Sequence, residues 1–151
     1  MADKQSSPRN ERTYMWLVMM KVFHAMAAHA RADLARNRLG LSDFAVLELL
    51  HHKGAMPVSA IGPKVHLTPG SISTAVDRLH AKKLVSRTED ATDRRVRTVN
   101  LTSKGRALIV PVFARHAATM GAASRGLTVR ECAELAALLK KLGKFAETLP
   151  C

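Results

Sequence analysis

The stretch from Leu67 to Leu101 constrains the fold of this chain most strongly, because helix and strand signals follow one another closely within it. Thr68 is a favourable helix N-cap, and Pro69 fits the first helical position, where a missing N–H loses no hydrogen bond. Ile72, Val76 and Leu79 recur at steps of four and three, so they share one apolar face. The opposite face is small and polar, with Ser71, Ser73, Thr74, Asp77 and Arg78.

Two strand patterns follow this helix. Residues 84–88 and 96–101 alternate apolar and polar side chains, and the turn-rich segment 89–93 joins them, which predicts a β-hairpin wing. Upstream, Ser59 is expected to cap a short helix over 59–65. Two short helices joined by a tight turn form a helix-turn-helix. The fold class is therefore predicted as mainly α with a small β-wing, in which a winged helix-turn-helix lobe spans residues 42–102.

Helices are expected on both sides of this lobe. Residues 1–10 are predicted to be a flexible arm, and a helix over 11–38 should end at Gly40. Ser42 is expected to cap the next helix and Gly54 to end it. Thr102 should open a helix that Pro111 kinks, and Thr128 with Glu131 should form a capping box for the last one. We expect residues 11–150 to be a single domain.

The outer helices, 11–38 and 104–150, carry more apolar surface than one small domain can cover. A leucine-rich stripe runs along the last helix. We therefore expect these segments to be dimerisation helices of a two-fold symmetric homodimer. The stripe consists of Leu135, Leu138, Leu139, Leu142, Phe145 and Leu149.

The charge of the chain favours a polyanionic partner. The formal net charge is +12, and residues 64–106 contain ten basic and four acidic side chains. Two cysteines, Cys132 and Cys151, are too few for a disulfide framework or a zinc site. No apolar run reaches the ~18 residues of a membrane span, and no signal peptide is apparent. We expect a cytoplasmic protein with no membrane partner.

On these residues the chain resembles the MarR family of bacterial transcriptional regulators. The similarity extends from about Tyr14 to Leu149. Its most specific part is the wing signature, formed by Asp93, Arg95, Leu101-Thr102 and Gly105. Residues 43–50 resemble the family's second helix, and Asp77-Arg78-Leu79 resembles the end of its recognition helix. Lys83 departs from the family, which usually has Gly there, and a left-handed backbone would cost a Lys roughly 1 kcal/mol.

The resemblance implies a sequence-specific double-stranded DNA-binding regulator, usually a repressor, on a palindromic operator. A helix with small polar side chains fits the major groove, its N-terminus favours a phosphate, and Gly70 removes bulk there. The expected contacts on this helix are Thr68, Pro69, Gly70, Ser71, Ser73, Thr74 and Arg78. The expected wing contacts are Arg87, Arg94, Arg95 and Arg97. The resemblance implies that Arg95 enters the minor groove, where narrow width favours Arg, while Asp93 holds the wing turn or orients an arginine.

The resemblance also implies release by a small-molecule effector, bound between the dimer helices and the DNA-binding lobe. The segment 43–85 is closest in appearance to members that answer to phenolic or quinone-like compounds. The candidate pocket residues are Trp16, Met19, Met20, Phe23 and His24, although such a stripe is more often core. No metal site or cofactor is expected, because the histidine spacings are poor for ligation on one helical face.

Two rival functions remain open. A sequence-independent architectural DNA-binding protein would use the same winged helix. An enzyme is disfavoured, because the sequence shows no nucleophile–base set, metal constellation or phosphate-binding loop.

Overall fold

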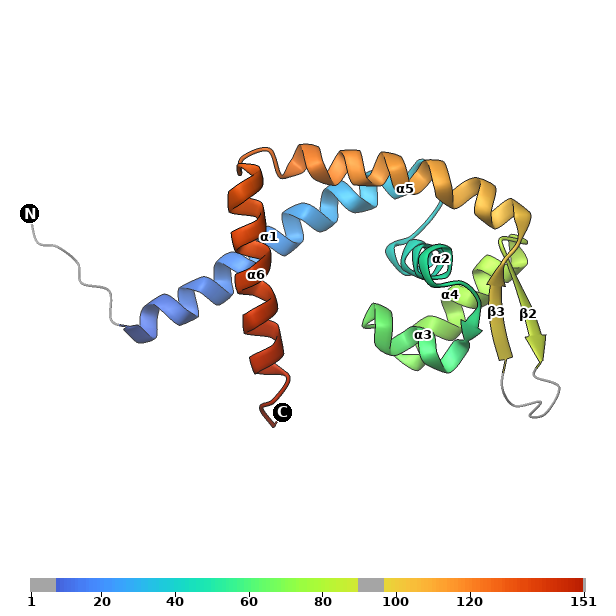
Figure 1. Ribbon diagram of the computed structural model, residues 1–151, viewed down its shortest axis with the longest axis horizontal. Coiled ribbons are helices and arrows are strands. Elements are labelled where there is room, and N and C mark those ends of the chain that lie inside the picture. The colour runs from blue at the N-terminus through green and yellow to red at the C-terminus, as the bar shows by residue number, and fades with distance from the viewer. Residues whose placement is uncertain (1–7, 90–96, 151) are drawn as a thin grey trace, which may run out of the picture.

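The computed structural model describes residues 8–89 and 97–150, which form six helices and three strands (Figure 1). The long helices α1 and α5 lie side by side, and the winged lobe is packed at one end of this pair. At the other end α5 turns into α6. The elements are α1 (Pro8–Ala35), α2 (Leu41–Lys53), β1 (Met56–Pro57), α3 (Val58–Val65), α4 (Pro69–Ala81), β2 (Val85–Glu89), β3 (Arg97–Leu101), α5 (Ser103–Ala123) and α6 (Val129–Ala146).

The predicted fold class is confirmed, and the wing has one strand more than expected. Within the described residues the sheet is antiparallel with strand order β1-β3-β2. Met56 pairs with Val99, and Val85 pairs with Leu101. Pro57 of β1 pairs with Thr98 of β3. Its position on an edge strand suits proline, which has no N–H to donate to a ladder.

One hydrophobic core joins the winged lobe to the long helices. Leu47 and Leu50 of α2, Ile61 of α3 and Leu79 of α4 are almost completely buried in it. The same cluster contains residues from outside the lobe. These are Leu34 of α1 and Ile109 and Val112 of α5. Each large aliphatic side chain that is buried stabilises the fold by about 1.5–3 kcal/mol. These contacts of α1 and α5 therefore hold the lobe in a fixed position.

Caps made by a threonine side chain were predicted correctly. Thr68 accepts a hydrogen bond from the Ser71 amide, and Thr102 accepts one from the Gly105 amide. Thr128 forms the full capping box with Glu131, whose pKa is lowered by hydrogen bonds from the backbone and the hydroxyl of Thr128.

Three other helix boundaries were wrong. Ser42 and Ser59 cap nothing, because α2 and α3 begin one residue before each and their N-caps are Gly40 and Pro57. Gly40 does not end α1, which begins at Pro8 and stops at Ala35. The helix is closed instead by Arg38 in the left-handed conformation, and the Leu39 amide donates to the Leu34 carbonyl.

Non-glycine residues close α3 and α4 in the same way. His66 has φ 53° and Lys83 has φ 59°. The Leu84 amide reaches back to the Leu79 carbonyl at 2.9 Å, which completes the end of α4. Lys83 thus adopts the left-handed backbone that was considered for it from the sequence, at a cost of about 1 kcal/mol.

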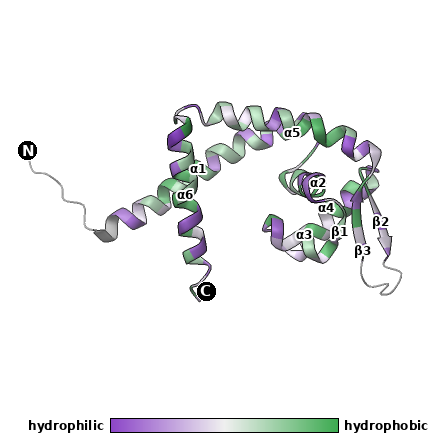
Figure 2. Cartoon of the chain, in the orientation of Figure 1, coloured by the Kyte–Doolittle hydropathy of each residue, from purple (hydrophilic) through white to green (hydrophobic). Residues whose placement is uncertain are grey.

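Helix α6 buries none of its residues in this chain. Leu138 and Phe145 are each 64% exposed, and Tyr14 and Trp16 on α1 are also more than half exposed. Figure 2 shows that apolar residues continue along both helices outside the core. Of the helices described, none combines the length and the apolar character needed to cross a membrane.

Candidate nucleic-acid interface

The N-terminus of α4 presents hydroxyl groups at the surface. The Thr68 hydroxyl donates to Ser71 Oγ at 2.9 Å and accepts from the Ser71 amide. An added Cβ at Gly70 would meet nothing within 4 Å, so the chain itself leaves open space there. The Thr74 hydroxyl donates to the Gly70 carbonyl at 2.9 Å and keeps its lone pairs available. This end of the helix is suited to an anionic partner.

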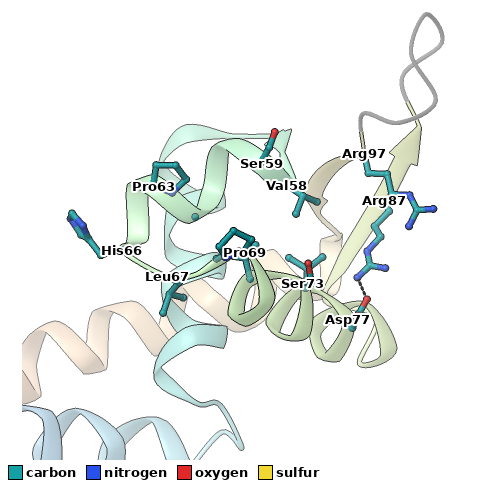
Figure 3. Close-up of a pocket in the computed structure, with 13 residues that line it drawn as sticks. Val58, Ser59, Pro63, His66, Leu67, Pro69, Ser73, Asp77, Arg87 and Arg97 are labelled. Atoms are coloured by element: carbon teal, nitrogen blue, oxygen red, sulfur yellow. Dashed lines mark hydrogen bonds and ion pairs between the residues drawn. The ribbon is translucent and has the colours of Figure 1, made fainter. Parts of the chain in front are cut away.

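An open cavity of about 1020 Å³ lies between α3, α4 and strands β2 and β3 of the wing (Figure 3). Its apolar floor includes Val58, Ile72 and Val76. Pro69 and Ser73 border it from α4, and the arginines of β2 and β3 border it from the wing. The polar edge of α4 and the wing therefore face a shared concave surface, as a helix and a ribbon must if both are to contact one duplex.

Arg78 was predicted as a DNA contact, and the structure gives it a partner within the protein. Its Nε and Nη2 donate to Asp43 Oδ1 at 3.1 and 2.6 Å. Asp43 is only 3% exposed, and Lys82 Nζ lies 3.9 Å from its second oxygen. The hydrogen bond from Arg78 to Asp43 raises the pKa of the guanidinium. The sequence analysis did not predict this link between α2 and α4.

Arg87 also has a partner. Its Nη2 donates to Asp77 Oδ1 on α4 in an ion pair (Figure 3). Arg97, at the start of β3, is exposed and lines the same cavity. Asp93, Arg94 and Arg95, the other wing residues predicted to matter, lie outside the described residues.

The base of the wing is joined tightly to α5. The Thr102 hydroxyl donates to the Lys83 and Leu84 carbonyls at 2.8 and 3.1 Å while it caps α5. The Lys104 ammonium donates to the Lys82 carbonyl at 2.9 Å. Thr102 is thus the single residue between β3 and α5, and its hydroxyl also holds the turn before β2.

A buried polar group connects α1 to α5 beside the lobe. Asp33 is 4% exposed and accepts hydrogen bonds from Arg115 Nε at 2.8 Å and, in the appropriate tautomer, His116 Nδ1 at 3.3 Å. The His116 ring lies against Phe44 of α2, with centroids 4.5 Å apart. Burial raises the pKa of Asp33, but the hydrogen bonds and charges of Arg115 and His116 more than offset this, so the net pKa is below its usual value.

The residues predicted to line an effector pocket form a surface in this chain. Trp16 is 55% and Phe23 63% exposed, and His24 is exposed beside Phe23. Met19 and Met20 are half-buried. Enclosing these side chains requires further protein atoms. Among the residues that the structure describes, no group of three or more His, Cys, Asp or Glu could hold a metal ion.

The MarR family model matches residues 39–96, which include the helix-turn-helix. The HTH-type transcriptional regulator MhqR of Bacillus subtilis is 35% identical over 133 residues, covering 88% of this chain and 92% of that protein. This relative is similar over nearly its whole length, so the similarity includes the outer helices as well as the lobe. The relatives that match this chain over most of its length are transcriptional regulators and not enzymes.

Solved structures agree with the fold. The structure of Bordetella bronchiseptica BpsR, described in connection with regulation of its DNA binding by 6-hydroxynicotinic acid, has a TM-score of 0.75 and 25% identity, covering 86% of this chain and 98% of that one. A mutant of E. coli MarR complexed with operator DNA has a TM-score of 0.80 and 22% identity, covering 91% of this chain and 99% of that one. With its winged helix-turn-helix lobe, basic charge and near full-length relatives, this chain belongs to the MarR family of DNA-binding transcriptional regulators.

Proposed function

We propose that this chain is a sequence-specific repressor that binds a palindromic operator as a homodimer and is released by a small-molecule effector. The observation that carries the proposal is the shared concave surface between α4 and the wing. A protein that needed only charge could use any basic surface. A polar helix edge held beside a ribbon is suited to reading base edges and the adjacent groove together.

In this proposal the N-terminal half of α4 contacts the major groove. Thr68 and Ser71 bind phosphate at the helix N-terminus, while Ser73 and Thr74 face base edges. Pro69 and Gly70 allow the helix backbone to approach closely. Arg78 has a smaller role than the sequence suggested, because Asp43 already neutralises it. With its side chain 46% exposed, it remains accessible to a phosphate from the solvent side.

The wing is proposed to supply the second set of contacts. Arg95 enters the minor groove, as the family resemblance implies, and Arg94 and Arg97 contact the backbone. In this proposal Asp93 holds the wing turn or orients an arginine, as the resemblance implies. The exposed position of Arg97 beside the cavity supports this arrangement.

A homodimer is proposed because the exposed apolar surfaces of α1 and α6 are otherwise unpartnered in this chain. Two-fold symmetry would place two α4 helices about one DNA turn apart, ~34 Å, which requires a palindromic site. The partner subunit would also cover Trp16 and Phe23. An effector pocket at these residues would then depend on dimer formation, and a flat phenolic or quinone-like compound suits aromatic walls.

Sequence specificity is tested by selecting bound duplexes from a random pool and measuring affinity at physiological salt. We expect an enriched palindrome bound at least about a thousandfold more tightly than random duplex. A ratio near unity would identify an architectural protein and reject the repressor.

Repression and release are tested by transcription from a promoter that carries this palindrome, with and without phenols and quinones. Activation by the protein would contradict the proposed repression.

The role of the wing is tested by Arg95→Ala. Loss of a minor-groove arginine should weaken operator binding by roughly 10- to 100-fold, while the circular dichroism spectrum and thermal midpoint stay unchanged. Arg125→Ala, which removes the same charge between α5 and α6, is the matched control and should change affinity little. Equal affinities of the Arg95→Ala and wild-type proteins would refute the assignment.

A further inference from the structure

An acidic side chain stands on the surface of α4 that is proposed to contact DNA. Asp77 follows Ser73 by one helical turn, and both line the cavity between α4 and the wing (Figure 3). Its side chain is 65% exposed. A carboxylate at such a place repels the phosphate backbone and lowers affinity for every duplex, whatever its sequence. Its presence in a strongly basic lobe calls for a compensating role.

The carboxylate is paired across the cavity. Asp77 accepts a hydrogen bond from Arg87 Nη2, so the pair joins α4 to β2 (Figure 3). The Arg87 side chain is only 24% exposed, and its Nε is buried with no hydrogen-bond partner in the described residues. The accessible part of the guanidinium is therefore directed at Asp77. An exposed pair of this kind adds little to fold stability, so stability alone does not account for it.

We propose that Asp77 is a specificity-determining residue, which acts by holding Arg87. The inference rests on the proposed sequence-specific function. By neutralising Arg87, Asp77 withholds a cation that would otherwise bind phosphate in any sequence. By joining α4 to the wing, it fixes the spacing of two elements that must contact the operator simultaneously. The first effect lowers non-specific binding, and the second favours only the specific complex.

Asp77→Asn separates these contributions, because it removes the charge and keeps the size. We expect affinity for random duplex to rise roughly three- to tenfold, and the salt dependence of that binding to steepen by about one phosphate contact, ~0.9 in slope. Operator affinity should rise less or fall, so the ratio of operator to random affinity decreases. Glu147→Gln, on an exposed residue at the end of α6, makes the same charge change and should leave the ratio unchanged.

Arg87→Ala and the double variant, which carries both Asp77→Asn and Arg87→Ala, complete a double-mutant cycle. If Asp77 acts through Arg87, Asp77→Asn should have little effect in the Arg87→Ala background. An equal rise in both affinities, an unchanged ratio, or a full effect of Asp77→Asn without Arg87 would each overturn the inference. A wild-type ratio near unity would instead reject the proposed sequence specificity, and this role of Asp77 with it, so the two failures are distinguishable.

Discussion

Gly105 lies where α5 passes the backbone of Leu84. A Cβ built at this glycine would stand 1.9 Å from the Leu84 carbonyl oxygen, which no backbone can accommodate without moving. The same carbonyl accepts hydrogen bonds from the hydroxyl and the amide of Thr102. The glycine is therefore required by close approach of two backbones and not by its own conformation.

We expect Gly105→Ala to destabilise the protein by roughly 2–4 kcal/mol, because either α5 or the turn before β2 must shift. Gly121→Ala, in the same helix, is the control. A Cβ there meets nothing within 4 Å, so the substitution should stabilise the helix by about 0.5–1 kcal/mol. Urea unfolding of both variants measures the difference. A Gly105→Ala protein as stable as the wild type would show that the two backbones separate easily.

The elements α1 and α5 are joined by polar contacts as well as apolar ones. Asp33 on α1 holds Arg115 and His116 on α5, and the Arg115 Nη2 also donates to Asn37 at 2.5 Å. These residues lie beside the packed ring of Phe44, where α2 meets both long helices. A buried carboxylate thus joins α1 to α5 close to the place where both pack against α2.

We expect Asp33→Asn to lower stability by about 2 kcal/mol at pH 7, since charge-assisted hydrogen bonds are lost. The net pKa of Asp33 is lowered in the folded chain, so its contribution is complete above the unfolded value of about 3.9. It disappears as the pH falls through the lower folded value. Urea unfolding at several pH values should show the gap between variant and wild type closing only below about pH 4. A gap that closes near pH 6 would assign the effect to another group.

Helix α6 has one apolar face and no buried residue in the single chain. If a second copy covers that face, Leu138→Glu should convert the dimer to a monomer, because an unpaired charge would have to be buried at the interface. Ala137→Glu adds the same charge outside the leucine-rich stripe, about 100° around the helix from Leu138, and should leave the dimer intact. Sedimentation measures the oligomeric state of both variants.

Deletion of the residues after Ala122 should likewise abolish the dimer. A truncated chain that still dimerises would place the interface elsewhere.

At the scale of the whole molecule, some of the 24 lysines and arginines are committed to contacts inside the lobe. Arg78 and Arg87 are paired with carboxylates, and Lys82 Nζ donates to the Arg38 carbonyl at 2.8 Å. The number of basic residues therefore overstates the number of cations that are available to phosphates. Salt dependence measures that number directly.

If each dimer neutralises ~6–10 phosphates, the logarithm of operator affinity should fall with the logarithm of salt concentration at a slope of about −5 to −9. Fluorescence anisotropy between 50 and 300 mM salt gives the slope. A value near −2 would show that few of the basic residues reach the backbone, and would leave base contacts to explain most of the affinity.

Signals local in sequence predicted this molecule well. The Thr68-Pro69 start of α4, the Thr102 cap and the Thr128–Glu131 capping box each depend on groups within three residues of one another. The features that were missed depend on distant partners. β1 is two residues long and is defined only by pairing with β3. Asp43 meets Arg78 from 35 residues away, which no local pattern records.

The core that the winged lobe shares with α1 and α5 limits how this lobe can be recombined with other domains. The segment 41–102 contains the whole helix-turn-helix and the wing, yet its core is completed by Leu34, Ile109 and Val112 from outside it. Excised alone, that segment would expose the apolar surface that these side chains cover. The winged helix-turn-helix lobe is therefore not an independently transferable domain. Gene fusion or domain shuffling can transfer it intact only together with α1 and α5, the helices that also lead to the proposed dimer interface.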